Sequence, residues 1–443
     1  MDILQKALKM LLDYSLCNYC LGRQFAMLGH GIENESRGES IRLLITLIDN
    51  NIILRRYKTS PEIMWTASTI NPSLPTLEVL KLCNDPREEN KQCPLCKDTF
   101  ENIKTFVNEA QKNLKDLEYT TFLVGIELPL EIAEQEDEFK ARYNVTHGES
   151  MRSQFSRDIG KLLCKITGKQ VDFRKPEVVV LVEPFTKIVR LRINPFYISG
   201  RYQKLVRGIP QSRWLCGNCL GNGCEICNWS GRKYQESIEE LIGIPMMEIT
   251  QGQEISFHGA GREDVDARML GSGRPFVLEI KEPKKRFIDL HKLEEKINKY
   301  ARGKVKVTRL CFANKDVVRK YKKAEGAEKI YRAIVEFGRN VSTDELKQVE
   351  ETLSNTIISQ QTPTRVLHRR ANLTRERYIY EAKTRKMSQN RAEIRIHCQG
   401  GLYIKELING DEGRTKTSVA SILGIEASTL ELDVLSVVTG DIK

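Results

Sequence analysis

Paired cysteines constrain the fold of this chain more than any other feature of its sequence. Eight of the twelve cysteines form four Cys-x-x-Cys pairs. A gap of two residues lets two thiolates reach one Zn²⁺ from a tight turn, and in a cytosolic chain this spacing favours metal over disulfides. Cys17/Cys20 and Cys93/Cys96 lie far apart in the sequence, and we predict that they combine into one four-cysteine zinc site closing the amino-terminal region. The alternative is that they belong to unrelated turns.

The other two pairs are close together and form a compact C-x2-C-x4-C-x2-C loop. Its members are Cys216, Cys219, Cys224 and Cys227. The glycines between them permit the sharp bends that so small a loop needs. Two readings remain open here, a second structural zinc and a reduced hinge loop without metal. The remaining cysteines are predicted to be buried small hydrophobic residues: Cys83, Cys164, Cys311 and Cys398.

Length and composition indicate a protein of several domains. A chain of 443 residues is long for one core, and a prior of roughly 100–200 residues per domain suggests about two to four. Apolar residues make up 40% of the sequence, enough to build real cores. There is no run of 18 or more apolar residues, and residues 1–6 lack the order of a signal peptide. We therefore expect a soluble, cytoplasmic protein without a membrane partner, and a monomer by default.

The positive charge is concentrated in the carboxy-terminal half. The net charge is +11, and residues 281–340 alone hold 19 Lys/Arg against 8 Asp/Glu. Residues 361–400 add ten basic side chains against three acidic ones, with tyrosines interleaved, as in Arg377-Tyr378-Ile379-Tyr380. Charge runs are usually solvated faces, but two such blocks with aromatic residues between the arginines favour a polyanion. Nucleic acid is the predicted partner.

Apolar periodicity gives a coarse map of the elements. It predicts helices over residues 2–14, 38–55, 149–168, 235–242, 289–300 and 344–358. It predicts strands over residues 120–130, 178–184 and 187–193, with further short strands beyond residue 242. The irregular segments are expected to be a loop region at 70–100, an acidic, poorly structured insertion at 131–143 and a basic loop at 194–202. The order of helix, strands and basic loop suggests a small α/β RNA-binding module.

The segment Gly261–Arg268 carries the strongest chemical signal. It sets Asp264 between Arg262 and Arg268, directly after a run at 255–260 that reads as a strand entering a glycine turn. Neighbouring cations favour the ionised form of a carboxylate. An ionised carboxylate in a loop after a strand can act as a nucleophile toward an electrophilic sugar carbon. A surface loop with an Arg/Asp ladder is the alternative, because structural ion pairs produce the same pattern.

Several segments together resemble one enzyme family. Residues 261–276 (GREDVDARMLGSGRPF), 329–335 (KIYRAIV) and 400–415 (GGLYIKELINGDEGRT) resemble, in order, the three core motifs of pseudouridine synthases. Longer matches at 147–161, 195–214 and 364–370 are similar to the THUMP-containing archaeal and eukaryotic tRNA pseudouridine synthases that modify the T arm. The resemblance covers nearly the whole chain. It implies tRNA as the partner, position 54, 55 or both as the target, and no organic cofactor.

The resemblance also implies an α+β architecture. A zinc-stapled, THUMP-containing amino-terminal half would precede a catalytic domain built on a mixed, mainly antiparallel sheet. The expected domains are an amino-terminal zinc-binding region at 1–100, a THUMP-like RNA-binding module at 101–200, a cysteine-rich connector at 201–235 and a pseudouridine synthase catalytic domain at 236–443.

The same resemblance assigns roles to individual residues. The Arg-x-Asp element, here Arg262-Glu263-Asp264, makes Asp264 the nucleophile, with Asp266 as its competitor. Tyr331 would stack on the target base and help to remove the C5 proton; otherwise it is a half-buried strand tyrosine. Tyr403 would line the uracil pocket and Lys405 would pair with the catalytic carboxylate, both on one face of a strand. Leu407 would complete the pocket wall.

Outside the catalytic motifs, a basic loop is predicted to grip RNA. Arg201, Lys204 and Arg207 would contact phosphates and fix the register of the tRNA. Tyr197 and Tyr202 beside them could stack on bases. The alternative is ordinary solvated surface.

Other classes of RNA enzyme find little support in the sequence. A methyltransferase would need a glycine-rich nucleotide loop, and Gly271-Ser272-Gly273 more plausibly turns a hairpin into residues 276–280. No G-x4-G-K-[ST] phosphate loop occurs, nor does the ATP-pyrophosphatase loop of a thiolation enzyme. The remaining alternative is a non-catalytic, zinc-dependent RNA-binding protein.

Overall fold

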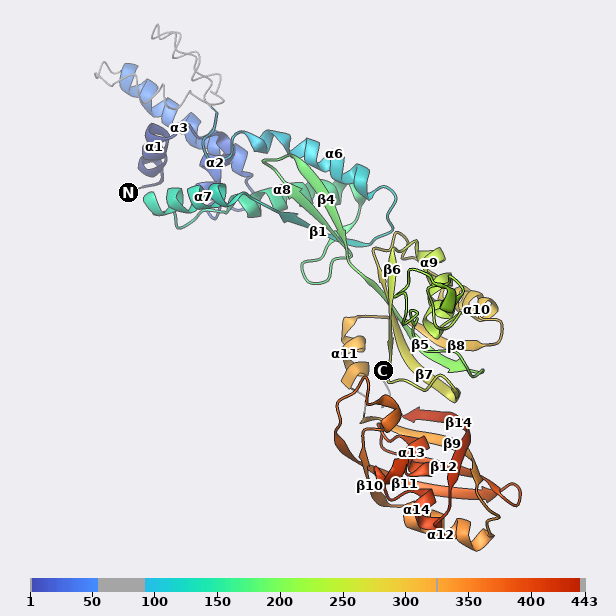
Figure 1. The fold of residues 1–443 in the computed structure, drawn as a ribbon. Helices are drawn as coiled ribbons and strands as arrows, with labels where there is room; N and C mark the ends of the chain where they lie inside the picture. Colours follow the sequence, from blue (N-terminus) through green and yellow to red (C-terminus); the bar gives the residue numbers. More distant parts are fainter. Residues whose placement is uncertain (1, 55–91, 324–325, 439–443) are drawn as a thin grey trace. The chain divides into compact units, whose positions relative to one another are not determined.

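Two compact units make up the chain. The structure, a computed structural model, describes residues 2–54, 92–323 and 326–438 (Figure 1). The units are Met1–Asn194 and Pro195–Lys443. The prediction for Cys83 and most of the loop predicted at 70–100 lie outside the described residues. Within the described ranges, no helix combines the length and the hydropathy that crossing a membrane requires.

The first unit is rich in helices. They are α1 (Ile3–Asp13), α2 (Asn18–Gly22), η1 (Arg23–Phe25), α3 (Asn34–Leu54), η2 (Thr99–Asn102), α6 (Ile103–Leu114), α7 (Leu130–Arg142) and α8 (Met151–Thr167). The predicted helices at 2–14, 38–55 and 149–168 correspond to α1, α3 and α8. A capping box at Asp2 begins α1, and Gly168 in the left-handed region ends α8.

The acidic segment 131–143 is not an irregular insertion, as predicted, but helix α7. Ile132, Glu136 and Phe139 follow the spacing of one helical face and are buried. Glu136 can be buried because the guanidinium of Arg23, itself buried, pairs with it. The density of carboxylates in the sequence concealed this periodicity.

In the described part of the first unit, the sheet has four strands in the order β2–β1–β3–β4. The strands are β1 (Thr121–Ile126), β2 (Gln170–Val171), β3 (Val178–Glu183) and β4 (Ile188–Ile193). β1 runs parallel to β2 and β3, and β4 is antiparallel to β3. Helices α6 and α8 pack against this sheet and against each other (Figure 1). Phe100 and Phe155 stack in the core with their ring centroids 4.0 Å apart.

The described residues of the second unit contain one sheet of ten strands. Its order is β13–β10–β11–β12–β9–β14–β7–β5–β8, with β6 also paired to β7. The strands are β5 (Phe196–Lys204), β6 (Glu254–Gly259), β7 (Ala267–Lys281), β8 (Val305–Ala313), β9 (Glu328–Phe337), β10 (Thr356–Gln361), β11 (Thr374–Lys386), β12 (Arg391–Cys398), β13 (Thr415–Lys416) and β14 (Ala427–Val438). Among the described strand pairs of this sheet, only that of β7 with β14 is parallel, which confirms the predicted mixed, mainly antiparallel sheet.

Helices cover the sheet of the second unit in two groups. The helical segments are η3 (Glu225–Cys227), α9 (Ile238–Thr250), α10 (Leu290–Tyr300), α11 (Lys315–Lys323), α12 (Thr343–Leu353), η5 (Thr364–Val366), α13 (Ile404–Asn409), η6 (Asp411–Gly413) and α14 (Val419–Leu423). α9 and α10 share one core with β5 and β7, while α12, α13 and α14 share another with β9 and β12. The helix predicted at 344–358 ends at Leu353, and the β-branched run Thr356-Ile357-Ile358 begins β10 instead.

Two segments predicted as irregular are parts of the large sheet. Residues 196–204 form β5, not a loop, and Ile198, Tyr202 and Lys204 are buried with the period of a strand. Residues 271–273 do not turn a hairpin but bend β7 in mid-strand, between its pairing with β14 and its pairing with β5. Gly271 has φ +57°, and a Cβ there would lie 2.0 Å from the carbonyl oxygen of Leu435. This bend requires glycine.

Candidate active site

The loop between β6 and β7 presents Asp264 at the mouth of a cavity. The loop is tightly turned, since the amide of Ala267 donates to the carbonyl oxygen of Asp264 over 3.1 Å. The amide of Gly208 donates to the carbonyl oxygen of Val265 over 2.9 Å. The side chain of Asp264 remains 34% exposed, so a substrate can reach it.

A buried lysine holds the backbone of this loop. The Nζ of Lys204 donates to the carbonyl oxygens of Asp264 (3.2 Å) and Val265 (2.7 Å). The residue is fully buried, and burial lowers the pKa of Lys204 to about 8. The prediction that Lys204 contacts a phosphate is therefore wrong. Its place on the inward face of β5 gives it a role in shaping the loop.

The residue before Asp264 anchors the loop in the core. The buried carboxylate of Glu263 accepts from the Nε of Arg274 (2.7 Å) and from the hydroxyl of Tyr202 (2.9 Å). Arg274 is also buried and donates to the carbonyl oxygen of Ala260 over 2.8 Å. With Glu263 turned inward, the backbone directs Asp264 the other way, toward the cavity. Tyr202 is fully buried in this network, so the prediction that it stacks on a base is wrong.

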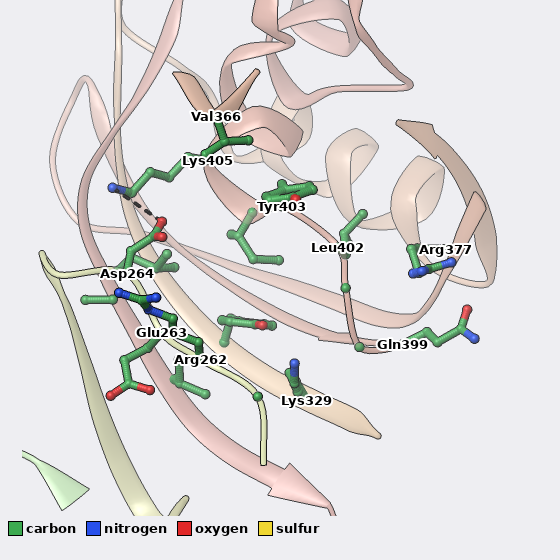
Figure 2. Close-up of a pocket in the computed structure, with 18 of the residues that line it drawn as sticks. Arg262, Glu263, Asp264, Lys329, Val366, Arg377, Gln399, Leu402, Tyr403 and Lys405 are labelled. Atoms are coloured by element: carbon green, nitrogen blue, oxygen red, sulfur yellow. Dashed lines mark ion pairs between the residues drawn. The ribbon is translucent and has the colours of Figure 1, made fainter. Parts of the chain in front are cut away.

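Two cations approach the carboxylate of Asp264. The Nη2 of Arg365 lies 3.0 Å from Oδ2 of Asp264, and its Nη1 lies 3.4 Å from Oδ1. The Nζ of Lys405 lies 3.9 Å from Oδ2, and Figure 2 shows this ammonium group turned toward Asp264. Lys405 makes its closer ion pair with Asp266. Arg365, which also donates to Glu406 over 2.6 Å, is the nearer partner of Asp264.

Arg365 is a site residue that sequence reasoning missed. Its segment, 364–370, was noted only as part of the family resemblance. A signal was present in the Arg-rich run Arg365-Val366-Leu367-His368-Arg369-Arg370. Nothing in the sequence connects this run with Asp264, about a hundred residues earlier. The short helix η5 presents Arg365 to the cavity.

Tyr331 lies where the sequence predicted it, on a strand facing the cavity. It is part of β9, between β12 and β14, and its ring is half-buried. Burial raises the pKa of Tyr331 above its ordinary range. Its hydroxyl is therefore protonated at neutral pH.

The segment around Tyr403 differs from its prediction. Tyr403 and Lys405 do not lie on a strand: Tyr403 is the N-cap of α13 and Lys405 is in its first turn. Both still line the cavity, and Nη1 of Arg370 donates to the Tyr403 hydroxyl over 3.0 Å. Leu407 is fully buried in the core on the inner side of α13, and Leu402 lines the cavity instead (Figure 2).

The cavity beside Asp264 has a volume of about 860 Å³ and a strongly basic lining. This volume is within the range of small-molecule and cofactor sites. The basic side chains that line it are Arg262, Lys322, Lys329, Arg365, Arg369, Arg370, Arg375, Arg377 and Lys405. Glu263 and Asp264 are the acidic residues of the lining, and Val265, Tyr331, Leu402 and Val434 belong to its less polar part. The arrangement suits an anionic ligand with a flat, partly apolar group.

The guanidinium groups of Arg201 and Arg207 bind to groups of the protein itself. The guanidinium of Arg201 donates to the carbonyl oxygens of Ser272 (2.7 Å) and Gly273 (2.8 Å). That of Arg207 donates to the carbonyl oxygen of Asp266 over 2.9 Å and pairs with Asp433 at 2.8 Å. These contacts support the β7 bend and the loop that carries Asp264. They leave little donor capacity for the phosphates that the sequence analysis assigned to them.

Each predicted cysteine set is brought together. Cys17, Cys20, Cys93 and Cys96 are buried with their sulfurs within 4.8 Å of one another. Cys216, Cys219, Cys224 and Cys227 form a second such cluster, whose closest Sγ–Sγ distances are 3.7–3.8 Å. Four sulfurs at ~2.3 Å from a tetrahedral Zn²⁺ would be about 3.8 Å apart. Backbone amides also donate to the sulfurs, for example Gly223 to Cys219 over 3.2 Å. Both donor sets fit a metal ion.

The sequence matches known proteins over nearly its whole length. Residues 197–438 match the family described as Pus10, C-terminal, and residues 106–183 the family described as Pus10 THUMP domain, archaeal. A Methanocaldococcus jannaschii protein named tRNA pseudouridine synthase Pus10 is 43% identical, covering 97% of this chain and 93% of the relative. Its namesake from Methanothrix thermoacetophila is 40% identical, covering 98% and 94%. A chain of a solved Cbf5-Nop10-Gar1 complex aligns over 44% of both chains with 16% identity and a TM-score of 0.29, too low to carry weight.

A mainly antiparallel sheet with an exposed aspartate beside a tyrosine, in a basic cavity, is the arrangement expected of a pseudouridine synthase catalytic domain. The family and sequence matches identify one family within that class. The chain belongs to the Pus10 family of tRNA pseudouridine synthases, which are isomerases. The family resemblance inferred from the sequence is confirmed.

Proposed function

We propose that this protein converts uridine into pseudouridine in the T arm of tRNA, at position 54, 55 or both, with Asp264 as the nucleophile. The observation that carries the proposal is the geometry around Asp264. Its carboxylate is accessible, held between Arg365 and Lys405, and next to a cavity lined by Tyr331 and Tyr403. Family membership supplies the reaction, and these contacts supply the assignment of roles.

The reaction needs only groups that the chain itself provides. Asp264 attacks or stabilises C1′ of the ribose as the C1′–N1 bond breaks and the uracil leaves with the bonding electrons. The uracil turns, C5 bonds to C1′, the C5 proton is lost and N1 takes up a proton, so substrate and product are isomers. The cations of the cavity stabilise the charge on the detached uracil and on the phosphates. Tyr331 holds the ring during its rotation and assists removal of the C5 proton.

The target uridine must leave its stack to enter the cavity. Extruding a base costs a few kcal/mol, and a loop such as that of the T arm lowers this cost. Arg369, Arg375 and Arg377 line the cavity and would contact the phosphates next to the extruded nucleotide. Such contacts fix position without reading sequence.

Both cysteine clusters would hold structural Zn²⁺. Cys17, Cys20, Cys93 and Cys96 would join distant segments of the first unit. Cys216, Cys219, Cys224 and Cys227 would close a loop of the second unit. The first unit, which contains the THUMP match at 106–183, would bind tRNA outside the T arm. We place the protein in the cytoplasm, acting as a monomer.

Mapping the product on a defined substrate tests the proposal. An unmodified tRNA transcript is incubated with purified protein, and pseudouridines are located by carbodiimide treatment and primer extension. We expect modification at position 54, 55 or both, without any added organic cofactor. Transcripts with cytidine at 54, at 55 or at both positions serve as matched controls. Tight binding without any pseudouridine would favour the non-catalytic RNA-binding alternative.

A further inference from the structure

The compact cysteine loop joins the rim of the catalytic cavity. We infer that this loop, residues 214–233, is an RNA-contacting element of the catalytic unit, in which the indole of Trp229 stacks on an unpaired base of the tRNA. The inference rests on the proposed function, because it assigns a second contact on the same substrate.

The loop is a tightly packed hairpin. Leu215 and Arg232 form an antiparallel bridge, and the amide of Cys216 donates to the carbonyl oxygen of Gly231 over 2.9 Å. The four cysteines then gather the tip into one cluster. The two arms are in such close contact that a Cβ at Gly231 would lie 2.4 Å from the carbonyl oxygen of Gly221. A preorganised platform of this kind loses little backbone conformational entropy when it binds.

The base of the hairpin contacts the cavity directly. The guanidinium groups of Arg262 and Arg369 lie 5.2 and 5.7 Å from the ring centroid of Trp214. Both arginines also line the cavity beside Asp264. These cation–π contacts fix the hairpin at the cavity rim. Any RNA strand whose uridine enters the cavity therefore passes near this hairpin.

The tip of the hairpin exposes large apolar side chains. Leu220 is 74% exposed, Ile226 77% and Trp229 73%. Trp229 also adopts φ +60°, in the left-handed region that bulky residues rarely occupy. Neither packing nor backbone preference explains a tryptophan there, and strain of this kind is typical of functional positions.

The surroundings of the tip favour RNA as the occupant. Arg213 and Lys233 on the stem are exposed, and Glu225 is the one acidic residue of the segment 212–235. The stem continues into the arginines of the cavity lining through Trp214. A base has a flat apolar face next to an anionic backbone, so it matches an exposed indole on a basic stem. A second copy of this basic chain would bring like charges together.

The test compares full-length, metal-loaded variants. Trp229→Ala removes the ring, Trp229→Phe restores an aromatic face, and Ile226→Glu places a negative charge at the tip. Met387→Ala removes an exposed apolar side chain from the turn between β11 and β12 and serves as the control. Binding and turnover are measured with unmodified tRNA, and zinc content and melting temperature are measured for each variant. Tryptophan emission is recorded as tRNA is added.

We expect Trp229→Ala to raise Kd and KM roughly tenfold with little change in kcat, as loss of one base stack predicts. Ile226→Glu should also raise Kd and KM, because its carboxylate repels the phosphates of the RNA. Trp229→Phe should recover most of the affinity, and Met387→Ala should match wild type. Addition of tRNA should quench tryptophan emission in wild type and much less in Trp229→Phe.

Unchanged Kd for all tip variants would overturn the inference. So would self-association of the wild type that Trp229→Ala abolishes in sedimentation, because the tip would then bind another copy. If the wild type forms no pseudouridine at all, the proposed function fails instead. If the wild type is active and the tip variants bind and react as it does, only the inferred role of the loop is contradicted.

Discussion

Asp264 and Asp266 are two residues apart, but their surroundings differ. Asp264 lines the cavity, and both nitrogens of the Arg365 fork approach its carboxylate. The side chain of Asp266 is 65% exposed and pairs with Lys405. Burial acts to raise the pKa of Asp266, but the hydrogen bond from Lys405 lowers it overall. Asp266 therefore fits the role of positioning Lys405, and Asp264 that of the nucleophile.

The hydroxyl and the ring of Tyr331 can be tested separately. Tyr331→Phe keeps the ring and loses the hydroxyl, so we expect kcat to fall strongly. The Kd for tRNA should change by less than about threefold, because the stacking surface remains. Tyr331→Ala loses the stacking surface as well and should abolish turnover. Single-turnover rates and filter binding give the two quantities. Wild-type rates for both variants would reduce Tyr331 to a packing residue.

Sequence reasoning found the residues whose signal is local. Asp264 and Tyr331 stand in short motifs whose neighbours indicate a strand or a turn. The contact between Asp264 and Arg365 joins segments 101 residues apart, and no local pattern encodes it. Lys204 was misread for a related reason, because a lysine in a basic stretch is usually exposed, whereas tertiary contacts with two carbonyl oxygens keep this one buried.

At the scale of elements, the catalytic loop is held by neighbouring strands. We expect Lys204→Met to lower kcat about tenfold or more, because its two hydrogen bonds fix the loop that carries Asp264. Affinity for tRNA should change little, since Lys204 is buried. In wild type, kcat should decline as the pH rises through about 8, where Lys204 loses its proton. That decline should be absent from the pH profile of Lys204→Met; an identical profile would contradict the assignment of the decline to Lys204.

A buried carboxylate on β14 links three strands and the segment after β5. Asp433 is fully buried and pairs with Arg207, Arg268 and Arg332. We expect Asp433→Asn to lower the free energy of unfolding by about 3 kcal/mol at neutral pH, the low end for broken buried pairs, since the arginines are partly exposed. Urea denaturation of the full chain measures this. Asp316→Asn, in an exposed pair with Arg319, is the control.

The effect of Asp433 depends on pH in a definite direction. Burial acts to raise the pKa of Asp433, but the hydrogen bonds from Arg268 and Arg332 and the charge of Arg207 lower it overall. A carboxyl whose pKa is lower in the folded state than in the unfolded state stabilises the fold. It does so fully at any pH above its pKa in the unfolded state, about 3.9. This stabilisation is lost as the pH falls through the folded-state value. The difference in the free energy of unfolding between wild type and Asp433→Asn should therefore become smaller in acid. A difference that stays constant with pH would contradict this prediction.

Element types followed from the sequence where an apolar pattern was long, as in α8 and α10. They failed in short or charged segments. The six residues of α13 have a sequence that is equally compatible with a strand. Because they form a helix instead, Leu407 lies in the core and not in the cavity wall. Pro195 and Gly200 suggested a loop, but pairing with β7 and β8 makes this segment a central strand. Tertiary pairing overrides local preference in such cases.

At the scale of the whole molecule, substitution of the cysteines of the first unit tests whether that unit binds tRNA while the second unit carries out catalysis. We expect Cys93→Ser with Cys96→Ser to lower the melting temperature and to raise KM for tRNA, because structural Zn²⁺ contributes folding energy directly. Catalysis at saturating tRNA should persist, since the second unit carries Asp264. Metal analysis should give at least one zinc per wild-type chain. Cys164→Ser, on α8 outside the cluster, is the control, and a folded, zinc-free wild type would refute the zinc assignment.

The fold class and the family could be predicted from the sequence because their signals span the whole chain. The first cysteine set lies in the amino-terminal half, whereas the basic blocks and the three ordered motifs lie in the carboxy-terminal half, and all of these signals agree. The path of β7 could not be predicted in the same way. Its bend at Gly271 depends on how closely Leu435 of β14 approaches. This is a contact between distant segments, and no local sequence pattern indicates it.

The central claim is that Asp264 carries out uridine isomerisation in tRNA. Its most direct test is release of tritium from C5-labelled uridine in a tRNA transcript, measured for wild type, Asp264→Asn and Asp266→Asn. The asparagine at 264 keeps shape and hydrogen bonding but loses the charge. We predict release by wild type, none by Asp264→Asn despite tRNA binding within about threefold of wild type, and reduced but measurable release by Asp266→Asn. Full release by Asp264→Asn together with none by Asp266→Asn would contradict the account.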